Sequence, residues 1–238
     1  MRIAMWSGPR NLSTAMMYAF GQRADVHVVD EPFYGPYLRA TGLDHPMRDA
    51  IVKSRPEGTF EVEQSLIGPI PGGKPHAYHK HMCQHIVPGI PRGFMAECVN
   101  VFLIRHPARV AASFLKGYPE TTAEDLGFRL QAELYDHACA LGQTPVVIDS
   151  ADIRENPEAM LRQLCDAVGL DWDPAMLSWP LGGHPADGVW AAHWYGAVHR
   201  STGFAGAEGA LPDTTGFEEM VAEVMPFYDR LSAVRLTA

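Results

Sequence analysis

The chain has 238 residues, a formal net charge of −9, 47% hydrophobic residues and 20% charged residues. This size and composition are typical of a single globular domain with a substantial core, and the negative charge argues against a general nucleic-acid-binding protein, which is normally basic. No stretch approaches the roughly 20 apolar residues of a membrane span. The apolar run at residues 1–6 is too short for a signal peptide, so we expect a cytoplasmic protein with neither nucleic-acid nor membrane partners.

The first thirty residues predict a strand, a helix and a second strand. Residues 2–6 (RIAMW) are apolar, residues 12–23 (LSTAMMYAFGQR) carry strong helix formers, and residues 26–30 (VHVVD) are β-branched. Such a βαβ unit implies parallel strands joined by a right-handed crossover.

The same alternation continues along the chain. Further strands are expected at residues 76–82, 100–104 and 145–149, and further helices at 46–54, 107–116, 122–141, 157–169 and 216–233. We therefore predict one α/β domain over residues 1–238, with a doubly wound, mostly parallel sheet flanked by helices. Residues 171–212 are rich in Trp, Gly, His and Pro and predict an irregular lid or acceptor-side segment.

The loop at residues 7–14 (SGPRNLST) joins the first expected strand to the first helix. Free backbone N–H groups and the helix dipole make such a helix start an anion site, and Arg10 adds a permanent cation. The alternative is an ordinary turn capped by Asn11 or Ser13. The loop lacks the lysine of G-x-x-x-x-G-K-[ST], which argues against ATP or GTP hydrolysis.

A second candidate loop follows the strand at residues 100–104. Arg105 comes directly after that strand, at the edge where parallel sheets bind ligands, and Ser113 lies about two turns into the helix that Pro107 begins. The two side chains could bracket one anion. A salt bridge from Arg105 and a packing role for Ser113 are the competing interpretation.

Together the two loops resemble those of the sulfotransferase family. The first is similar to the family's 5′-phosphosulfate loop, P-[RK]-S-G-[ST]-[ST], over Pro9, Arg10, Asn11, Leu12, Ser13 and Thr14. Arg105 and Ser113 have the spacing of its 3′-phosphate motif, and residues 146–149 and 153–169 resemble a later strand and helix. The resemblance spans roughly residues 1–180.

This resemblance implies a P-loop fold and a function. The donor would be 3′-phosphoadenosine 5′-phosphosulfate, the product adenosine 3′,5′-bisphosphate, and the acceptor a hydroxyl or amine of a small molecule or carbohydrate. Arg10 would neutralise the departing phosphate oxygen, and the scheme requires no metal.

Two positions depart from the family's pattern. Leu12 stands where a glycine is usual. The family's late Arg-Lys-Gly loop has no literal copy, and Arg200, within residues 199–204 (HRSTGF), is the nearest counterpart as a cofactor contact.

A hydroxyl acceptor also needs a base. Glu31 follows the second strand, where some family members place a catalytic glutamate. His81 lies where others keep a histidine, with Lys80 beside it as a second positive group. We favour Glu31, with His81 or Asp30 as alternatives. Glu31 could equally be an ordinary helix-start carboxylate.

Other side chains have competing interpretations. If the strand ran on to residue 85, His79, His81, Cys83 and His85 would share one face, but a metal site there is less expected than packing. The alternative functions are a P-loop nucleotide kinase or NTPase and a non-catalytic nucleotide-binding protein of the same fold. The oligomeric state stays open, with a homodimer among the alternatives.

Overall fold

The computed structural model describes residues 1–237 and is built on a five-stranded sheet of order β2-β3-β1-β4-β5. All pairings between neighbouring strands are parallel, which confirms the doubly wound α/β prediction. The strands are β1 (Arg2–Ser7), β2 (Val26–Asp30), β3 (His76–Met82), β4 (Val99–Ile104) and β5 (Val146–Asp149). Strand β1 is central, so the chain builds one half of the sheet and then the other.

Most helices begin and end near the expected residues. They are α1 (Ser13–Gly21), α2 (Tyr34–Thr41), α3 (Arg48–Lys53), α4 (Thr59–Ile67), α5 (Pro107–Phe114), α6 (Phe128–Ala140), α7 (Ser150–Glu155), α8 (Pro157–Val168) and α11 (Glu218–Ser232). The helix expected at 122–141 begins only at Phe128, because Gly127 adopts a left-handed conformation with φ 77°. Helices α2, α4 and α7 were not expected from the sequence.

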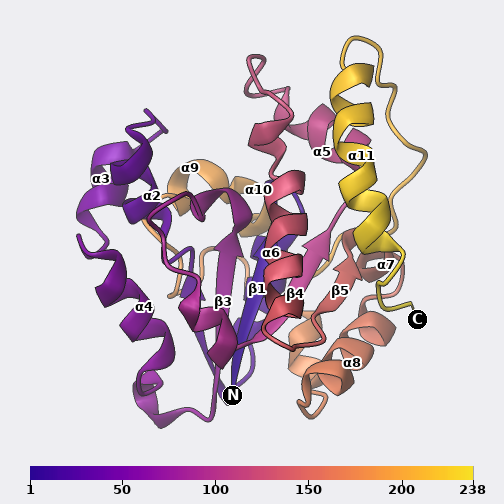
Figure 1. The fold of residues 1–238 in the computed structure, drawn as a ribbon. Helices are drawn as coiled ribbons and strands as arrows, with labels where there is room; N and C mark the ends of the chain where they lie inside the picture. Colours follow the sequence, from indigo (N-terminus) through magenta and orange to yellow (C-terminus); the bar gives the residue numbers. More distant parts are fainter. Residues whose placement is uncertain (238) are drawn as a thin grey trace.

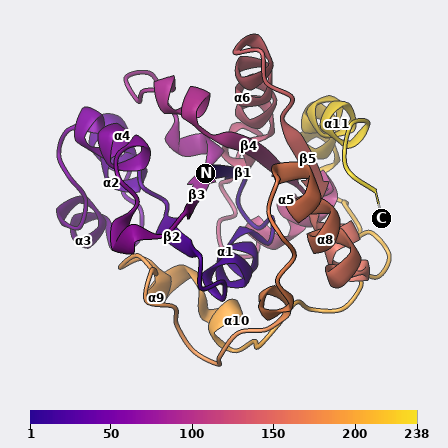
Figure 2. The ribbon, with the colours of Figure 1, turned by 90° about the horizontal axis from the view of Figure 1, so that it is seen from below.

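The two faces of the sheet carry separate parts of the core. Alternate side chains of a strand point to opposite faces, so Ile3 and Met5 of β1 pack with α1 and α8, whereas Ala4 and Trp6 pack with α6 and α11. Figure 2 shows α1 and α8 on one side of the sheet and α6 and α11 on the other.

All five strands end at the same edge of the sheet, and the loops that follow them meet there (Figure 1). The loop after β1 packs closely against the turn before α6, because a Cβ on Gly8 would lie 2.7 Å from the carbonyl oxygen of Leu126. Only glycine fits such a contact without movement of the backbone.

Residues 171–212 contain only short helical pieces, as expected from their composition. These are η5 (Pro174–Leu177), α9 (Ala191–Trp194) and α10 (Gly196–His199), and an isolated bridge joins Ser178 to Gly203. Within residues 1–237, no helix is both long and apolar enough to span a bilayer.

Buried amides stabilise the central strands. Asn100 accepts a hydrogen bond from Trp6 Nε1 at 2.8 Å and donates to Gln143 Oε1 at 2.6 Å. We expect Asn100→Leu to lower the free energy of unfolding by about 1–3 kcal/mol, because these buried groups lose their partner. Urea denaturation measures the loss. Adding Gln143→Leu should cost less than the sum of the single changes, and an unchanged stability in Asn100→Leu would contradict the assignment.

Candidate active site

A cavity of about 430 Å³ opens at the C-terminal edge of the sheet. Its walls include most of the residues that the sequence nominated: Pro9, Arg10, Asn11, Leu12, Ser13, Thr14, Glu31, Lys80, Arg105 and Ser113. The fold thus brings together two loops that lie almost a hundred residues apart in the chain. A cavity at the point where the strand order reverses is the usual ligand site of doubly wound sheets.

The first loop ends in a helix start without a side-chain cap. Leu12 is the N-cap residue of α1, and no side-chain hydrogen bond caps the helix there. The first N–H groups of a helix have no partner within the helix, so they are available to an anion.

Two non-glycine residues of this loop adopt left-handed backbone conformations. Arg10 has φ 62° and Leu12 has φ 70°. Leu12 therefore adopts the conformation that the usual glycine would adopt, at a cost of about 1–2 kcal/mol for an L-residue. Strain of this kind persists where the surroundings fix the backbone.

Hydrogen bonds tie the two loops to the sheet and to each other. The buried Asn11 donates to the carbonyl oxygen of Leu103 at 3.1 Å, and Gln131 donates to the same oxygen at 2.9 Å. Arg105 Nη1 donates to the carbonyl oxygen of Arg10 at 2.6 Å. These hydrogen bonds fix the position of the loop after β1 relative to β4 and to Arg105.

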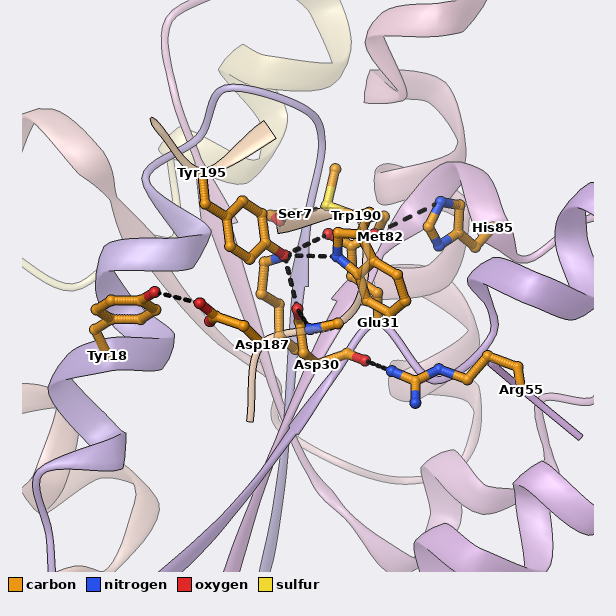
Figure 3. A network of polar contacts seen from close by, with 12 residues as sticks. Ser7, Tyr18, Asp30, Glu31, Arg55, Met82, His85, Asp187, Trp190 and Tyr195 are labelled. Atoms are coloured by element: carbon orange, nitrogen blue, oxygen red, sulfur yellow. Dashed lines mark hydrogen bonds and ion pairs between the residues drawn. The ribbon is translucent and has the colours of Figure 1, made fainter. Parts of the chain in front are cut away.

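A buried ion cluster contributes Glu31 and Lys80 to the wall of the cavity. Figure 3 shows the polar contacts around Asp30 and Glu31 in this cluster. Asp30 and Lys80 are register partners on β2 and β3, and Lys80 Nζ contacts Asp30 Oδ1 at 3.0 Å. Glu31 follows Asp30 with φ 37°, and its carboxylate also pairs with Lys80 Nζ. Lys80 is only 1% exposed, so its charge is balanced inside the protein rather than by water.

Tyr195, from the irregular segment, completes this cluster. Its hydroxyl lies 2.6 Å from Lys80 Nζ, 2.8 Å from Asp30 Oδ1 and 3.1 Å from Glu31 Oε1. Trp190 Nε1 donates to the same oxygen at 3.0 Å. Figure 3 shows the ring of Tyr195 directing its hydroxyl at the two carboxylates.

The pKa values in the cluster follow from burial and charge. Burial raises the pKa of Asp30, with Lys80 opposing the shift. Burial alone would lower the pKa of Lys80, but the charges of Asp30 and Glu31 outweigh it and raise that pKa above its ordinary value. Lys80 therefore stays protonated at neutral pH.

Aromatic side chains that the sequence did not nominate line the cavity beside Glu31. Tyr34 stacks on His85 with ring centroids 4.5 Å apart, and its hydroxyl lies 3.0 Å from His45 Nδ1. His85 Nε2 lies 4.0 Å from Glu31 Oε2. Burial lowers the pKa values of both histidines, which keeps them neutral at pH 7. A stacked neutral wall suits an uncharged or aromatic part of an acceptor.

Three nominated residues lie away from the cavity wall. His81 faces the opposite side of β3 from Lys80 and stacks on Trp6 at 4.4 Å, because neighbouring residues of a strand point to opposite faces. Asp30 is buried behind Glu31, and Arg200 is exposed and does not line the cavity. The candidate base at the cavity is therefore Glu31 rather than His81 or Asp30.

The strand does not run on to residue 85, so the histidine alignment considered for a metal site does not form. Strand β3 ends at Met82, and Cys83–His85 form a short 3-10 helix, so His79 and His85 do not share a face. Within the described residues 1–237, no group of His, Cys, Asp and Glu side chains is arranged to hold a metal ion.

The ion cluster generates a prediction about Lys80. We expect Lys80→Met to lower the free energy of unfolding at pH 7 by about 3–5 kcal/mol, because two carboxylates lose their buried cation. A raised carboxyl pKa means that the folded state binds more protons than the unfolded chain, so stability should recover as the pH falls from 7 toward about 4. Denaturant titrations across this range, with exposed Lys53→Met as control, measure it. A deficit that grows on acidification would contradict the assignment.

The chain is similar to known proteins over most of its length. The chain is 36% identical over 232 residues to branched-chain-amino-acid aminotransferase-like protein 2 of Arabidopsis thaliana, and 41% identical over 204 residues to protein 1 of the same name. The match covers 96% and 85% of this chain but only 41% and 36% of those proteins, so the chain spans about two-fifths of their length. Their aminotransferase-like names therefore describe much longer proteins.

Two solved structures share the fold. A sulfotransferase domain from the curacin biosynthetic pathway superposes with TM-score 0.56 at 18% identity, covering 99% of this chain and 98% of that one. A sulfotransferase from Alicyclobacillus acidocaldarius gives TM-score 0.58 at 12% identity, covering 100% and 97%. The sulfotransferase domain family model matches residues 1–235. The chain therefore belongs to the sulfotransferase family.

Proposed function

We propose that this sulfotransferase moves the sulfuryl group of 3′-phosphoadenosine 5′-phosphosulfate to a hydroxyl or amine of a small-molecule or carbohydrate acceptor. The observation that carries the proposal is the shared cavity. It holds an uncapped helix start beside Arg10, a second arginine with Ser113, and a carboxylate beside aromatic side chains.

The residues present fit such a donor. The uncapped start of α1, with Ser13 and Thr14, suits the 5′-phosphosulfate end, and Arg105 with Ser113 suits the 3′-phosphate. Arg105 Nε and Ser150 Oγ are buried without a hydrogen-bond partner, and both residues line the cavity. When bound, the donor supplies a sulfuryl group attached to a phosphate leaving group.

The chain's own residues would then stabilise the charge on the leaving phosphate and accept the proton of the acceptor. Arg10 is exposed and lines the cavity, so its guanidinium can balance negative charge that develops on the leaving phosphate. Glu31 can take the proton that an acceptor hydroxyl loses. Lys80 and Tyr195 hold one oxygen of Glu31, whereas its other oxygen, 4.0 Å from His85 Nε2, can face an acceptor.

Ligand-induced thermal shift and labelled-sulfate transfer test this proposal. Adenosine 3′,5′-bisphosphate should raise the Tm, whereas ATP with magnesium should not, and the reverse result would favour a kinase or NTPase. Transfer of labelled sulfate from the donor across a panel of hydroxyl and amine acceptors should give product. Binding without transfer to any acceptor would favour a non-catalytic protein of this fold.

Arg10 is the first residue to test. We expect Arg10→Ala to weaken binding of adenosine 3′,5′-bisphosphate by roughly 10-fold or more, since a hydrogen bond to a charged group contributes about 1.5–3 kcal/mol. Isothermal titration calorimetry measures the affinity, with Arg92→Ala as a control at a surface ion pair. Unchanged affinity would remove Arg10 from the proposed site.

Glu31 is the second residue to test. We expect Glu31→Gln to lower turnover of the acceptor found in the panel by about 10²–10⁴-fold, the usual contribution of a general base. Donor affinity should stay within about twofold, since no donor contact is assigned to Glu31. Turnover close to that of the unaltered protein would show that another group accepts the proton.

A further inference from the structure

Three arginines converge on one carboxylate beside the cavity. Arg154 Nη1 lies 2.7 Å from Glu208 Oε1, Arg109 Nε lies 2.9 Å from Glu208 Oε2, and Arg105 Nη2 also pairs with Oε1. The Glu208 side chain is only 3% exposed. We call these four residues the Glu208 cluster.

The charges of the Glu208 cluster do not balance. Three guanidinium charges face a single carboxylate charge, and Arg105 Nε is buried without a hydrogen-bond partner. A carboxylate has two oxygens, whereas a phosphate monoester has three terminal oxygens and carries nearly two charges. The arginines therefore suit a phosphate group better than the carboxylate that they hold.

The cluster also lies against the ligand cavity. Arg105 and Arg154 both line it. So does Ser150, one helical turn before Arg154 on α7, whose buried hydroxyl has no partner. Arg105 is the residue that the family resemblance assigns to the 3′-phosphate, and here its guanidinium pairs with Glu208.

Glu208 sits on a segment with few other anchors. No helix or strand lies between Phe204 and Phe217, and residues 205–207 and 209–211 are exposed. Besides the carboxylate, two arginine contacts hold the backbone beside Glu208 in the described residues 1–237: Arg154 Nε donates to the carbonyl oxygen of Gly206 at 2.9 Å, and Arg109 donates to that of Gly209. Moving this stretch would disturb little of the core.

From these observations we infer that Glu208 is an internal counter-anion that competes with the donor's 3′-phosphate for Arg105, Arg109 and Arg154. This inference rests on the proposed function. The carboxylate neutralises part of the charge of the arginines in the free protein and leaves them when the phosphate enters. Arg109 and Arg154 thereby become phosphate contacts alongside Arg105.

The exchange has a direct energetic consequence. Only protein in which the internal competitor has left the site can bind the ligand. The apparent affinity is therefore the intrinsic affinity multiplied by the fraction of protein in that open state. Glu208 therefore weakens the binding of every ligand that uses the three arginines. Its return to them would also speed release of the 3′-phosphorylated product.

Replacing Glu208 tests the competition. We expect Glu208→Gln to bind adenosine 3′,5′-bisphosphate roughly 10-fold more tightly than the unaltered protein, while binding of adenosine 5′-phosphate changes by less than about twofold. Calorimetric titrations at constant salt measure both ligands. Glu133→Gln removes the same charge from a carboxylate that also pairs with arginines, Arg92 and Arg129, but is exposed, so its affinities should not change.

The outcomes separate the inference from the proposed function. Weaker or unchanged binding of the bisphosphate by Glu208→Gln would overturn the competition and indicate that Glu208 holds the segment over the ligand or has no role in binding. If the unaltered protein binds no bisphosphate, the proposed donor is wrong. Binding of inorganic phosphate then tests the competition. Glu208→Gln should bind inorganic phosphate more tightly than the unaltered protein does, and equal affinity would refute the competition. Glu208→Asp, with a shorter carboxylate, should shift affinity in the same direction and serves if Glu208→Gln does not fold.

Discussion

The ion cluster of Lys80 with Asp30 and Glu31 is the interaction on which the arrangement of the site depends. A lysine that is 1% exposed can keep its charge only if carboxylates lie against it. The parallel register of β2 and β3 supplies the first of them, since Asp30 is the register partner of Lys80. The second, Glu31, is the side chain that reaches the cavity.

The same cluster joins the irregular segment to two neighbouring strands of the sheet. Asp30 ends β2 and Glu31 follows it, Lys80 belongs to β3, and Tyr195 lies between α9 and α10. A buried charge is costly unless every neighbour is in place, so the segment is held to the sheet by a polar contact and not only by apolar packing. Glu208 plays a comparable part for residues 204–217 through its ion pairs with Arg105 and Arg154, which line the cavity.

The strands and the two loops that line the cavity were predictable from the sequence because their signals are local. The apolar strand before Ser7, the turn formers after it and the helix formers from Ser13 onward define the first loop within a few residues. Arg105 was predictable for the same reason, since it directly follows an unmistakable buried strand. The structure also explains why the family usually has a glycine at this position, because Leu12 adopts the left-handed backbone conformation that favours glycine.

The rest of the site depends on contacts between distant residues, which no local pattern encodes. His81 and Lys80 look equally suited to catalysis in the sequence, and only the sheet decides which of them faces the cavity. Helices α2 and α4 lie among prolines and glycines that mask their periodicity. Glu208 carries no signal at all, since an acidic residue in a glycine-rich stretch normally remains solvated.

The hydroxyl of Tyr195 links the shape of the acceptor side of the cavity to the environment of Glu31. It contacts Glu31, and it belongs to the segment that forms a wall of the cavity. If a related protein acquired a new acceptor by exchanging residues 171–212, it would also exchange the hydroxyl that contacts the proposed base, Glu31. Acceptor range and base strength could then diversify only together, unless the replacement kept a hydroxyl at this one position.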